Sequence, residues 1–436
     1  MKKNTFKNVL DVEKQVGIEV FLTKNEGIGG KIRFYPEDFV VEEISKFPIE
    51  NNNGKFCIVE VSAVNWETNH LVKEISNSLH ISRKRISFGG TKDKRSKSKR
   101  LMSFYNVNKE DIDKISIKDV DIKFLFKSDK PLKIGDLIGN KFNINIRKIE
   151  NNIENIDNNF KSIESIGGFP NFYGIQRFGT VRPITHIVGK YLVLGDFEKA
   201  VMTYIANPIK GEDELSYSLR SDLEKTHDFS EALKSYPIHL NFEKSILNKL
   251  VLDSKDFVGA IMELPKNLLT MFIYAYQSYL FNKILSRRIL NDMPINRAVV
   301  GDILYPIKNN NIELREIPVS DFNLNKVNEE IDKGKAIVTG QLFGSNSEYS
   351  DGEIGEIEKA IIDEENINLK DFIIPEIPFI SSKGSRRALF SIINNLVFNI
   401  KKEDDIYLNV KFELSKGCYA TSFLREIMKS DDIKNY

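Results

Sequence analysis

The patterning of apolar residues changes along the 436-residue chain, and this change limits how a core can form. Residues 54–64, 116–149 and 405–415 are typical of β-strands, because apolar and polar side chains tend to alternate there. Residues 116–149 predict a pair of strands joined by a turn at 131–139, and residues 68–80 predict a helix with Thr68 as its cap. Between the strand-like ends of the chain, residues 268–290 repeat apolar side chains at helical spacing. A chain of this length usually divides into domains of roughly 100–200 residues. We therefore expect two or three compact units, with strand-like ends around a differently built interior.

Charge and composition exclude several classes of protein. Lys and Arg number 63 and Asp and Glu number 62, so any site for a polyanion must be local. No apolar run reaches the roughly 18 residues that a membrane span needs, and we expect a cytoplasmic protein without a membrane partner. Two cysteines, Cys57 and Cys418, with five scattered histidines predict neither a disulfide framework nor a zinc site. The common nucleotide-binding glycine loops are absent, so we expect chemistry by side chains without metal or cofactor.

Residues 83–100 depart from this balance of charge. They contain nine Lys or Arg and one acid, Asp93. A short apolar run at 86–88 ends in Gly89 and Gly90, which predicts a strand and places Asp93 on the loop that follows. Clustered cations are the electrostatic footprint of nucleic-acid binding, and they also favour the ionised form of a nearby acid. The alternative is a solvated basic loop without a ligand.

We predict that five basic residues close to Asp93 contact an RNA backbone. They are Lys92, Lys94, Lys97, Lys99 and Arg100. Lys92 and Lys94 also flank the acid directly in the sequence, so their charges would favour its ionised form.

Two further motifs carry aromatic residues next to polar ones. The motif PNFYGIQRFG at 170–179 holds three aromatics, and GCYATSFLRE at 417–426 holds Tyr419. Such groups can stack a flipped base while an amide reads its edge. The alternatives are a tight turn with core aromatics and a helix start capped by Thr421. In YAYQSYLF we expect a buried helix in which Gln277 is satisfied internally.

Six motifs in fixed order resemble the TruD family of tRNA pseudouridine synthases, and its archaeal branch in particular. They are IRFYPEDFVVEEI (32–44), GTKDKRSKSKR (90–100), PNFYGIQRFG (170–179), AYQSYLFN (275–282), KGSRRALF (383–390) and FELSKGCYATSFLREIMK (412–429). The matches extend over nearly the whole chain.

The resemblance implies an enzyme that isomerises uridine to pseudouridine in tRNA, at position 13 in the typical member, without cofactor or metal. It implies an α+β fold in which a mixed sheet forms a catalytic domain from both chain ends, here residues 1–179 and 386–436. A family-specific α+β domain is expected as an insertion at 180–385, with the RNA in the cleft between the two. No obligate protein partner is inferred.

The resemblance also implies roles for single residues. Asp93 falls on the catalytic aspartate and Arg33 on a basic residue that pairs with it. The positions that line the uridine pocket are Phe39, Asn171, Tyr173 and Tyr419. Tyr173 stands where the family usually has phenylalanine. Ser96, Ser98 and Arg100 replace the usual alanine, threonine and glutamine, so this copy is more basic just after Asp93.

Chemistry leaves alternatives open at this stage. A carboxylate could attack C1′ of the ribose or remove a proton from C2′, and the sequence does not separate these routes. A non-catalytic RNA-binding protein would explain loop 83–100 and the aromatic pocket without a role for Asp93. A metal-dependent nuclease is a weaker alternative, because that reaction generally requires several convergent carboxylates and loop 83–100 supplies one.

Overall fold

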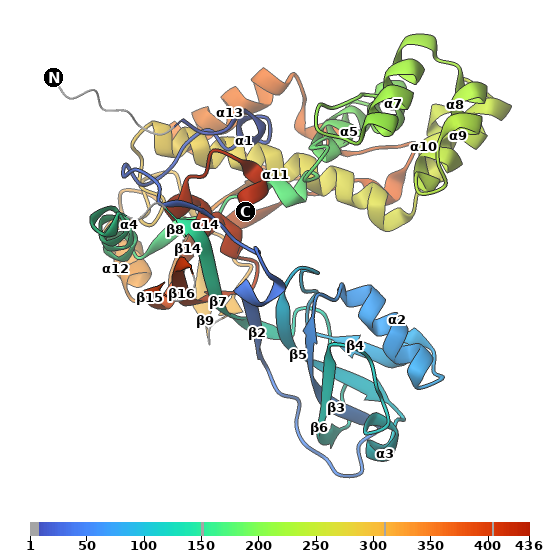
Figure 1. The fold of residues 1–436 in the computed structure, drawn as a ribbon. Helices are drawn as coiled ribbons and strands as arrows, with labels where there is room; N and C mark the ends of the chain where they lie inside the picture. Colours follow the sequence, from blue (N-terminus) through green and yellow to red (C-terminus); the bar gives the residue numbers. More distant parts are fainter. Residues whose placement is uncertain (1–7, 150–151, 309–310, 403–404) are drawn as a thin grey trace.

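A nine-stranded mixed sheet forms the main layer of the computed structural model, which describes residues 8–149, 152–308, 311–402 and 405–436 (Figure 1). The strands lie in the order β15-β16-β7-β2-β5-β3-β6, with β1 beside β7 and β4 beside β5. β2 pairs with β5 in parallel, and the other neighbours pair antiparallel. Their bounds are β1 (Gly29–Lys31), β2 (Phe39–Ser45), β3 (Phe56–Val64), β4 (Ile86–Phe88), β5 (Lys97–Tyr105), β6 (Val120–Ser128), β7 (Leu137–Ile149), β15 (Asn394–Lys402) and β16 (Ile406–Ser415).

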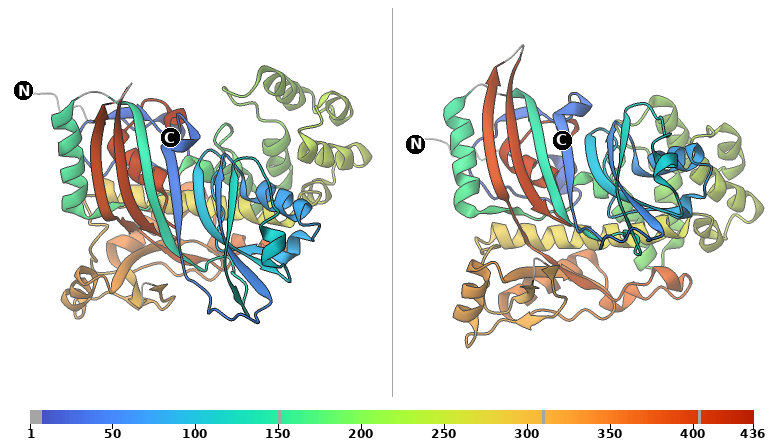
Figure 2. Two further views of the ribbon diagram at one scale, coloured as in Figure 1. Left: turned by 60° about the horizontal axis from the view of Figure 1, so that its bottom comes forward. Right: turned by 90° about the horizontal axis from the view of Figure 1, so that it is seen from below.

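This sheet is assembled from both ends of the chain, as expected. β16 pairs with β7 over nine residues, from Tyr407 opposite Arg147 to Ser415 opposite Gly139. Figure 2 shows the two C-terminal strands beside the N-terminal strands in one continuous layer. The fold class is therefore α+β with a mixed sheet, and the sequence expectation is confirmed.

The helix α14 (Ala420–Met428) packs on one face of this sheet. Its Phe423 lies 4.8 Å from Phe412 of β16 between ring centroids, and Phe412 stacks on Phe142 of β7 at 5.1 Å. Burial of each such side chain contributes roughly 1.5–3 kcal/mol. The same apolar cluster includes Phe39 of β2 and residues of α4 (Ile153–Ile166). The residue that precedes α14, Tyr419, is thereby fixed above the same face as Phe39.

The helix α2 (Thr68–Ser78) covers the other half of the sheet, where it packs on β3 and β5 through Leu71 and Ile75. The short α3 (Lys109–Ile112) follows β5. The sequence predicted Thr68 as the N-cap of α2, and this is wrong. The side chain of Glu67 caps the helix instead, by accepting from the backbone N–H groups of Asn69 and His70. The Thr68 hydroxyl is directed to the loop that carries Asp93.

The middle of the chain forms a group of helices and a second sheet. Residues 185–262 hold α5 (Thr185–Val193), α6 (Phe197–Ile205), α7 (Glu214–Thr226), α8 (Phe229–Ser235), α9 (Asn241–Leu252) and α10 (Phe257–Met262). Figure 1 shows this group at one end of the long α11. The second sheet has the order β10-β9-β12-β13, with β11 beside β9. The remaining elements are β9 (Ile303–Lys308), β10 (Asn311–Ile312), β11 (Ile317–Pro318), α12 (Leu324–Asp332), β12 (Ala336–Leu342), α13 (Gly352–Glu365) and β13 (Ser385–Ala388).

The helix α11 (Lys266–Leu290) matches the long helical pattern in the sequence. It is buried on several sides because it contacts α5, α13 and β12. Gln277 within it is 5% exposed, and its amide donates to the Phe343 carbonyl and to the Ser382 hydroxyl. The expectation of an internally satisfied glutamine is confirmed.

The structure bears on two expectations about how the strands pair and where the domains divide. The segment 116–149 contains two strands, but β6 and β7 do not form the predicted pair, since β6 pairs with β3 and β7 lies between β2 and β16. β13 crosses the expected boundary at 385/386 and pairs with β12 of the middle sheet. The domain limits at 179/180 and 385/386 stay predictions.

Two properties of the described residues bear on the expected class of protein. None of their helices combines the length and apolar character that a membrane crossing requires. They also hold no group of three or more His, Cys, Asp or Glu side chains arranged for a metal ion. Cys57 and Cys418 are both free.

Candidate active site

Asp93 lies on the loop between β4 and β5 and is paired with Arg33. The Arg33 guanidinium donates from Nη2 to Oδ2 of Asp93 at 2.5 Å. Its side chain is 10% exposed, whereas that of Asp93 is 56% exposed. The guanidinium also lies 4.2 Å above the centroid of the Phe39 ring. Burial lowers the pKa of Arg33, and the charge of Asp93 counteracts this. The structure thus brings together three residues that the sequence singled out.

Hydrogen bonds hold the backbone of this loop at Lys92, one residue before Asp93. Thr68 of α2 accepts from the backbone N–H of Lys92 at 2.9 Å and donates to the Lys92 carbonyl at 3.3 Å. The hydroxyl of Ser96 donates to the backbone carbonyl of Asp93 at 2.7 Å. These bonds fix the backbone on both sides of the carboxylate, so that its side chain faces solvent from a defined position.

Two of the five basic residues predicted to contact an RNA backbone are buried. The Lys92 ammonium pairs with Glu43 of β2 at 3.0 Å, and the two side chains are 5% and 1% exposed. Arg100 is 1% exposed and donates to the hydroxyls of Thr68 and Ser98, both at 2.7 Å. Burial lowers the pKa of Arg100 to about 10. Burial of both side chains disfavours direct contact with an RNA backbone, and these two contacts stay predictions.

The other three basic residues remain available at the surface. Lys94 and Lys97 are exposed. Lys99 has a side chain that is 42% exposed and pairs with Glu60 of β3 at 3.0 Å. Contacts of these three residues with RNA stay a prediction.

A second cluster surrounds Tyr173 and Tyr419. Their rings lie 6.1 Å apart between centroids, Tyr173 is 8% exposed and Tyr419 is 37% exposed. Burial raises the pKa of the Tyr419 phenol. The Arg387 guanidinium lies 4.1 Å above the centroid of the Tyr173 ring and 5.7 Å from that of Tyr419. These two rings and the cation therefore form one cluster, in which Tyr419 is the more exposed ring.

Asn171 supports this cluster from inside. It is 3% exposed, its Nδ2 donates to the Ala388 carbonyl at 2.9 Å, and its Oδ1 accepts from Nη2 of Arg387 at 2.7 Å. Both polar atoms of the amide therefore have protein partners in this arrangement. The sequence reasoning treated an amide of this motif as a reader of the base edge, and the structure shows this one holding Arg387.

Hydrogen bonds connect the segments that carry the two clusters. The Gly135 N–H in the turn before β7 donates to the Gly89 carbonyl at 2.8 Å. The Lys416 ammonium donates to the Gly135 carbonyl at 3.1 Å, and the Arg387 guanidinium donates to the Gly417 carbonyl at 2.9 Å. These bonds join the loop of Asp93, the turn before β7 and the segment before α14.

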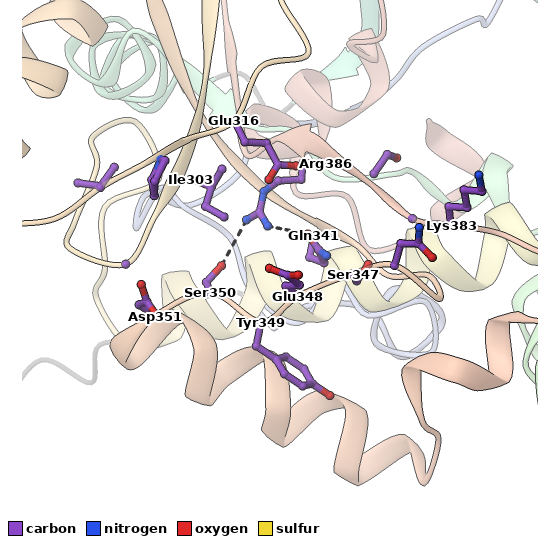
Figure 3. Close-up of a pocket in the computed structure, with 16 residues that line it drawn as sticks. Ile303, Glu316, Gln341, Ser347, Glu348, Tyr349, Ser350, Asp351, Lys383 and Arg386 are labelled. Carbon is purple, nitrogen blue, oxygen red and sulfur yellow. Dashed lines mark hydrogen bonds between the residues drawn. The ribbon is translucent and has the colours of Figure 1, made fainter.

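Sequence reasoning missed Arg387, although it lies in the motif KGSRRALF. Consecutive residues of a strand point to opposite faces, so Arg386 and Arg387 of β13 are separated by the sheet. Arg386 enters a pocket of about 470 Å³ in the middle of the chain, shown in Figure 3. There it donates to Gln341 at 2.6 Å and lies 3.8 Å from Glu358. None of the residues predicted for the active site lines that pocket, so its volume does not mark the site of chemistry.

Comparison with known proteins identifies the family. The family model described as tRNA pseudouridine synthase D (TruD) matches residues 15–427. The chain belongs to the TruD family. This is a family of isomerases, and the resemblance inferred from the motifs is confirmed.

Relatives of known name match the chain over almost its full length. A probable tRNA pseudouridine synthase D from Methanococcoides burtonii is 40% identical over 443 residues, which cover 98% of this chain and 99% of the relative. A protein of the same description from Methanosarcina barkeri is 40% identical over 436 residues, with 98% and 99% covered. The crystal structure of the putative TruD from Methanosarcina mazei has a TM-score of 0.88 at 39% identity and covers 98% of this chain and 100% of that one.

Proposed function

We propose that this TruD protein isomerises a uridine of tRNA to pseudouridine, at position 13, with Asp93 as the catalytic carboxylate and the target uridine flipped out of its stack. The observation that supports this most directly is the exposed Asp93 carboxylate, paired with the buried Arg33 guanidinium at 2.5 Å. The Tyr419 ring directly precedes α14, which packs in the same apolar cluster as Phe39, the residue under Arg33. A carboxylate together with an exposed aromatic ring suits chemistry at a nucleoside.

The reaction breaks the bond from C1′ to N1, turns the uracil and joins C1′ to C5; C5 loses its proton and N1 gains one. Nothing is oxidised or reduced. Asp93 can attack C1′ or remove the C2′ proton, and both routes need a carboxylate oxygen close to the ribose. Arg33 engages Oδ2 of Asp93, which leaves Oδ1 to face the ribose. Since side chains suffice for each step, we propose that neither metal nor cofactor is required.

The target uridine must leave its stack, which costs a few kcal/mol. Stacking on an aromatic ring returns roughly 1–3 kcal/mol. Tyr419, at 37% exposed, presents a ring for this purpose. The Phe39 ring is 3% exposed and lies under the Arg33 guanidinium, so we assign Phe39 to the support of Arg33 and Tyr419 to the base. A tRNA substrate is also the basis for proposing that the protein works in the cytoplasm.

The first test is incubation of the purified protein with an unmodified tRNA transcript and EDTA, followed by mapping of pseudouridine by chemical modification and primer extension. We expect pseudouridine at position 13 with the wild type. We expect none with Asp93→Asn, and tRNA binding by that variant should be nearly unchanged, because the substitution removes the nucleophile or base and keeps the shape. The exposed Asp113 provides a control, and Asp113→Asn should retain activity.

Each other outcome has a distinct meaning. Pseudouridine at another position would retain the reaction and overturn the assignment to position 13. Tight tRNA binding without any pseudouridine would favour the non-catalytic RNA-binding alternative. Activity of Asp93→Asn would remove Asp93 from the mechanism, and inhibition by EDTA would contradict metal independence.

A further inference from the structure

Arg387 is a cation held between aromatic rings without a counter-ion. Its guanidinium lies 4.1 Å from the Tyr173 centroid and 5.7 Å from the Tyr419 centroid. In the described part of the chain it forms hydrogen bonds to Asn171 and Gly417 but no ion pair with a carboxylate. By contrast, the neighbouring Arg386 lies 3.8 Å from Glu358. A half-buried cation without a carboxylate is suited to an anionic ligand.

Two of the three nitrogens of the Arg387 guanidinium, Nη2 and Nε, contact protein acceptors and fix its orientation. Nη2 donates to Oδ1 of Asn171 at 2.7 Å and to the Gly417 carbonyl at 2.9 Å, while Nε approaches the Asn171 carbonyl at 3.4 Å. Nη1 takes part in none of the hydrogen bonds found among the described residues. The guanidinium therefore has one edge bound to protein and one donor left for a ligand. Such a donor is preorganised, because no side chain has to move before it acts.

The proposed reaction itself produces a planar anion, the detached uracil, which can accept a hydrogen bond from a guanidinium. When the bond from C1′ to N1 breaks, the electron pair stays on the base, and its negative charge spreads over N1, O2 and O4. If Asp93 attacks C1′, an ester bond forms as this bond breaks, and attack by C5 later releases the carboxylate. If Asp93 instead takes the C2′ proton, a glycal forms and the proton is returned. The detached uracil is an anion on either route. At the end C5 loses its proton to solvent and N1 takes one up, so that the product is an isomer of uridine.

We propose that Arg387 donates a hydrogen bond from Nη1 to a carbonyl oxygen of the target uracil and stabilises the negative charge that develops on the base. This rests on the proposed function, because it assigns a role within the same pocket. A phosphate of the RNA is the other anion that a guanidinium could meet. The base fits better, since the exposed Tyr419 ring lies beside the guanidinium and suits stacking with a planar ring.

The test compares two bases at the target position of a synthetic tRNA, uridine and 5-fluorouridine. Fluorine withdraws electrons and stabilises the uracil anion. Cleavage of the bond from C1′ to N1 therefore requires less stabilisation of the departing base by the enzyme. Single-turnover rates are followed by loss of the parent nucleoside in digests, and tRNA affinity is measured separately. The variants are Arg387→Gln, Arg387→Lys and the control Arg297→Gln, which removes an arginine that is 54% exposed in the middle of the chain.

For uridine, we expect Arg387→Gln to slow the single turnover about 100-fold, the usual effect of removing one preorganised donor. Its Kd for tRNA should stay within about 3-fold of the wild type, as for an interaction made mainly in the transition state. For 5-fluorouridine the loss should shrink to about 10-fold or less, since less charge stabilisation is needed. Arg387→Lys should recover part of the rate because it keeps the charge, and Arg297→Gln should match the wild type.

Three results would overturn the proposal. One is a wild-type rate for Arg387→Gln. Another is an equal loss for both bases in Arg387→Gln and Arg387→Lys, which a purely structural role through Asn171 would produce. The third is a loss mainly of affinity with a weaker salt dependence, which would indicate a phosphate contact. The wild type in the same assay tests the proposed function separately, because its yield of pseudouridine does not depend on how the Arg387 variants compare.

Discussion

At the scale of single residues, Arg33 is held in an unusual conformation. Its backbone φ of +53° lies in the left-handed region, which costs a side-chain-bearing residue of order 1–3 kcal/mol. The surrounding contacts compensate for this cost, because the guanidinium is buried over Phe39 and paired with Asp93. The conformation directs a long side chain back under the catalytic loop. We infer that Arg33 orients the carboxylate.

Replacement of Arg33 tests this orientation. Arg33→Met keeps an unbranched apolar stem over Phe39 and removes the bond to Oδ2. We expect turnover to fall about 100-fold, the usual effect of an ångström-scale misplacement of a reacting group, while tRNA affinity changes little. Single-turnover rates and filter-binding affinities would show this, with the exposed Arg83 replaced as Arg83→Met for control. A variant with wild-type turnover would show that Asp93 needs no partner.

At the scale of elements, the loop that carries Asp93, between β4 and β5, depends on the first turn of α2. The Thr68 hydroxyl bonds the Lys92 backbone and also accepts from the buried Arg100 guanidinium at 2.7 Å. One oxygen thus joins helix, strand and loop directly before Asp93. The buried Arg100 guanidinium therefore lies behind the loop that carries Asp93.

Thr68→Val is nearly isosteric and removes that oxygen. It would leave a buried guanidinium and a backbone N–H without this partner, which costs about 1–3 kcal/mol for each unsatisfied group. We expect a lower midpoint of thermal unfolding together with slower turnover at unchanged tRNA affinity. Thr68→Ser keeps the hydroxyl and should resemble the wild type in both measurements. Equal behaviour of the two variants would show that the hydroxyl does not position the loop.

The same elements show what the sequence could and could not predict. Strand 56–64 and helix 266–290 were predictable, because apolar periodicity reports burial directly. The pairing of β7 with β16 depends on contacts between chain ends, which a local pattern does not encode. The burial of Arg100 was not predictable from a count of charges, which does not show which face of β5 each residue takes: Lys97 is exposed, whereas Ser98 and Arg100 are buried. Lys92 precedes β5, and its side chain is buried against Glu43 of β2. Arg387 was missed because the motif KGSRRALF does not show which of its two arginines faces the aromatic cluster.

At the scale of the whole molecule, the site combines parts that are distant in sequence. Asp93 comes from the N-terminal strands, Arg387 from a strand of the middle sheet and Tyr419 from the segment before the last long helix. The pairing of β16 with β7 brings the third part to the first, and the bond from Arg387 to Gly417 joins the second to the third. The proposed uridine site therefore requires that all three parts of the chain are assembled.

Charge on the whole molecule is balanced, so attraction of tRNA must come from local surface. Burial of Lys92 and Arg100 removes two cations from the predicted RNA surface and leaves Lys94, Lys97 and Lys99. Each phosphate contact adds about 0.7–0.9 to the slope of log affinity against log salt. Replacement of all three lysines by glutamine should therefore weaken tRNA binding and lower this slope by about 2–3. Affinity measured between low and moderate salt gives the slope directly.

The matched control replaces three exposed lysines away from this surface, Lys234, Lys333 and Lys359, whose side chains are 75%, 53% and 48% exposed. It removes the same net charge, so a general effect of charge on long-range attraction would appear equally in both triple variants. We expect the control to keep the wild-type slope. If both variants lose the same slope, the loop beside Asp93 is not the phosphate-binding surface. If neither does, the cations that neutralise the tRNA lie elsewhere, and the basic loop serves mainly to hold Asp93.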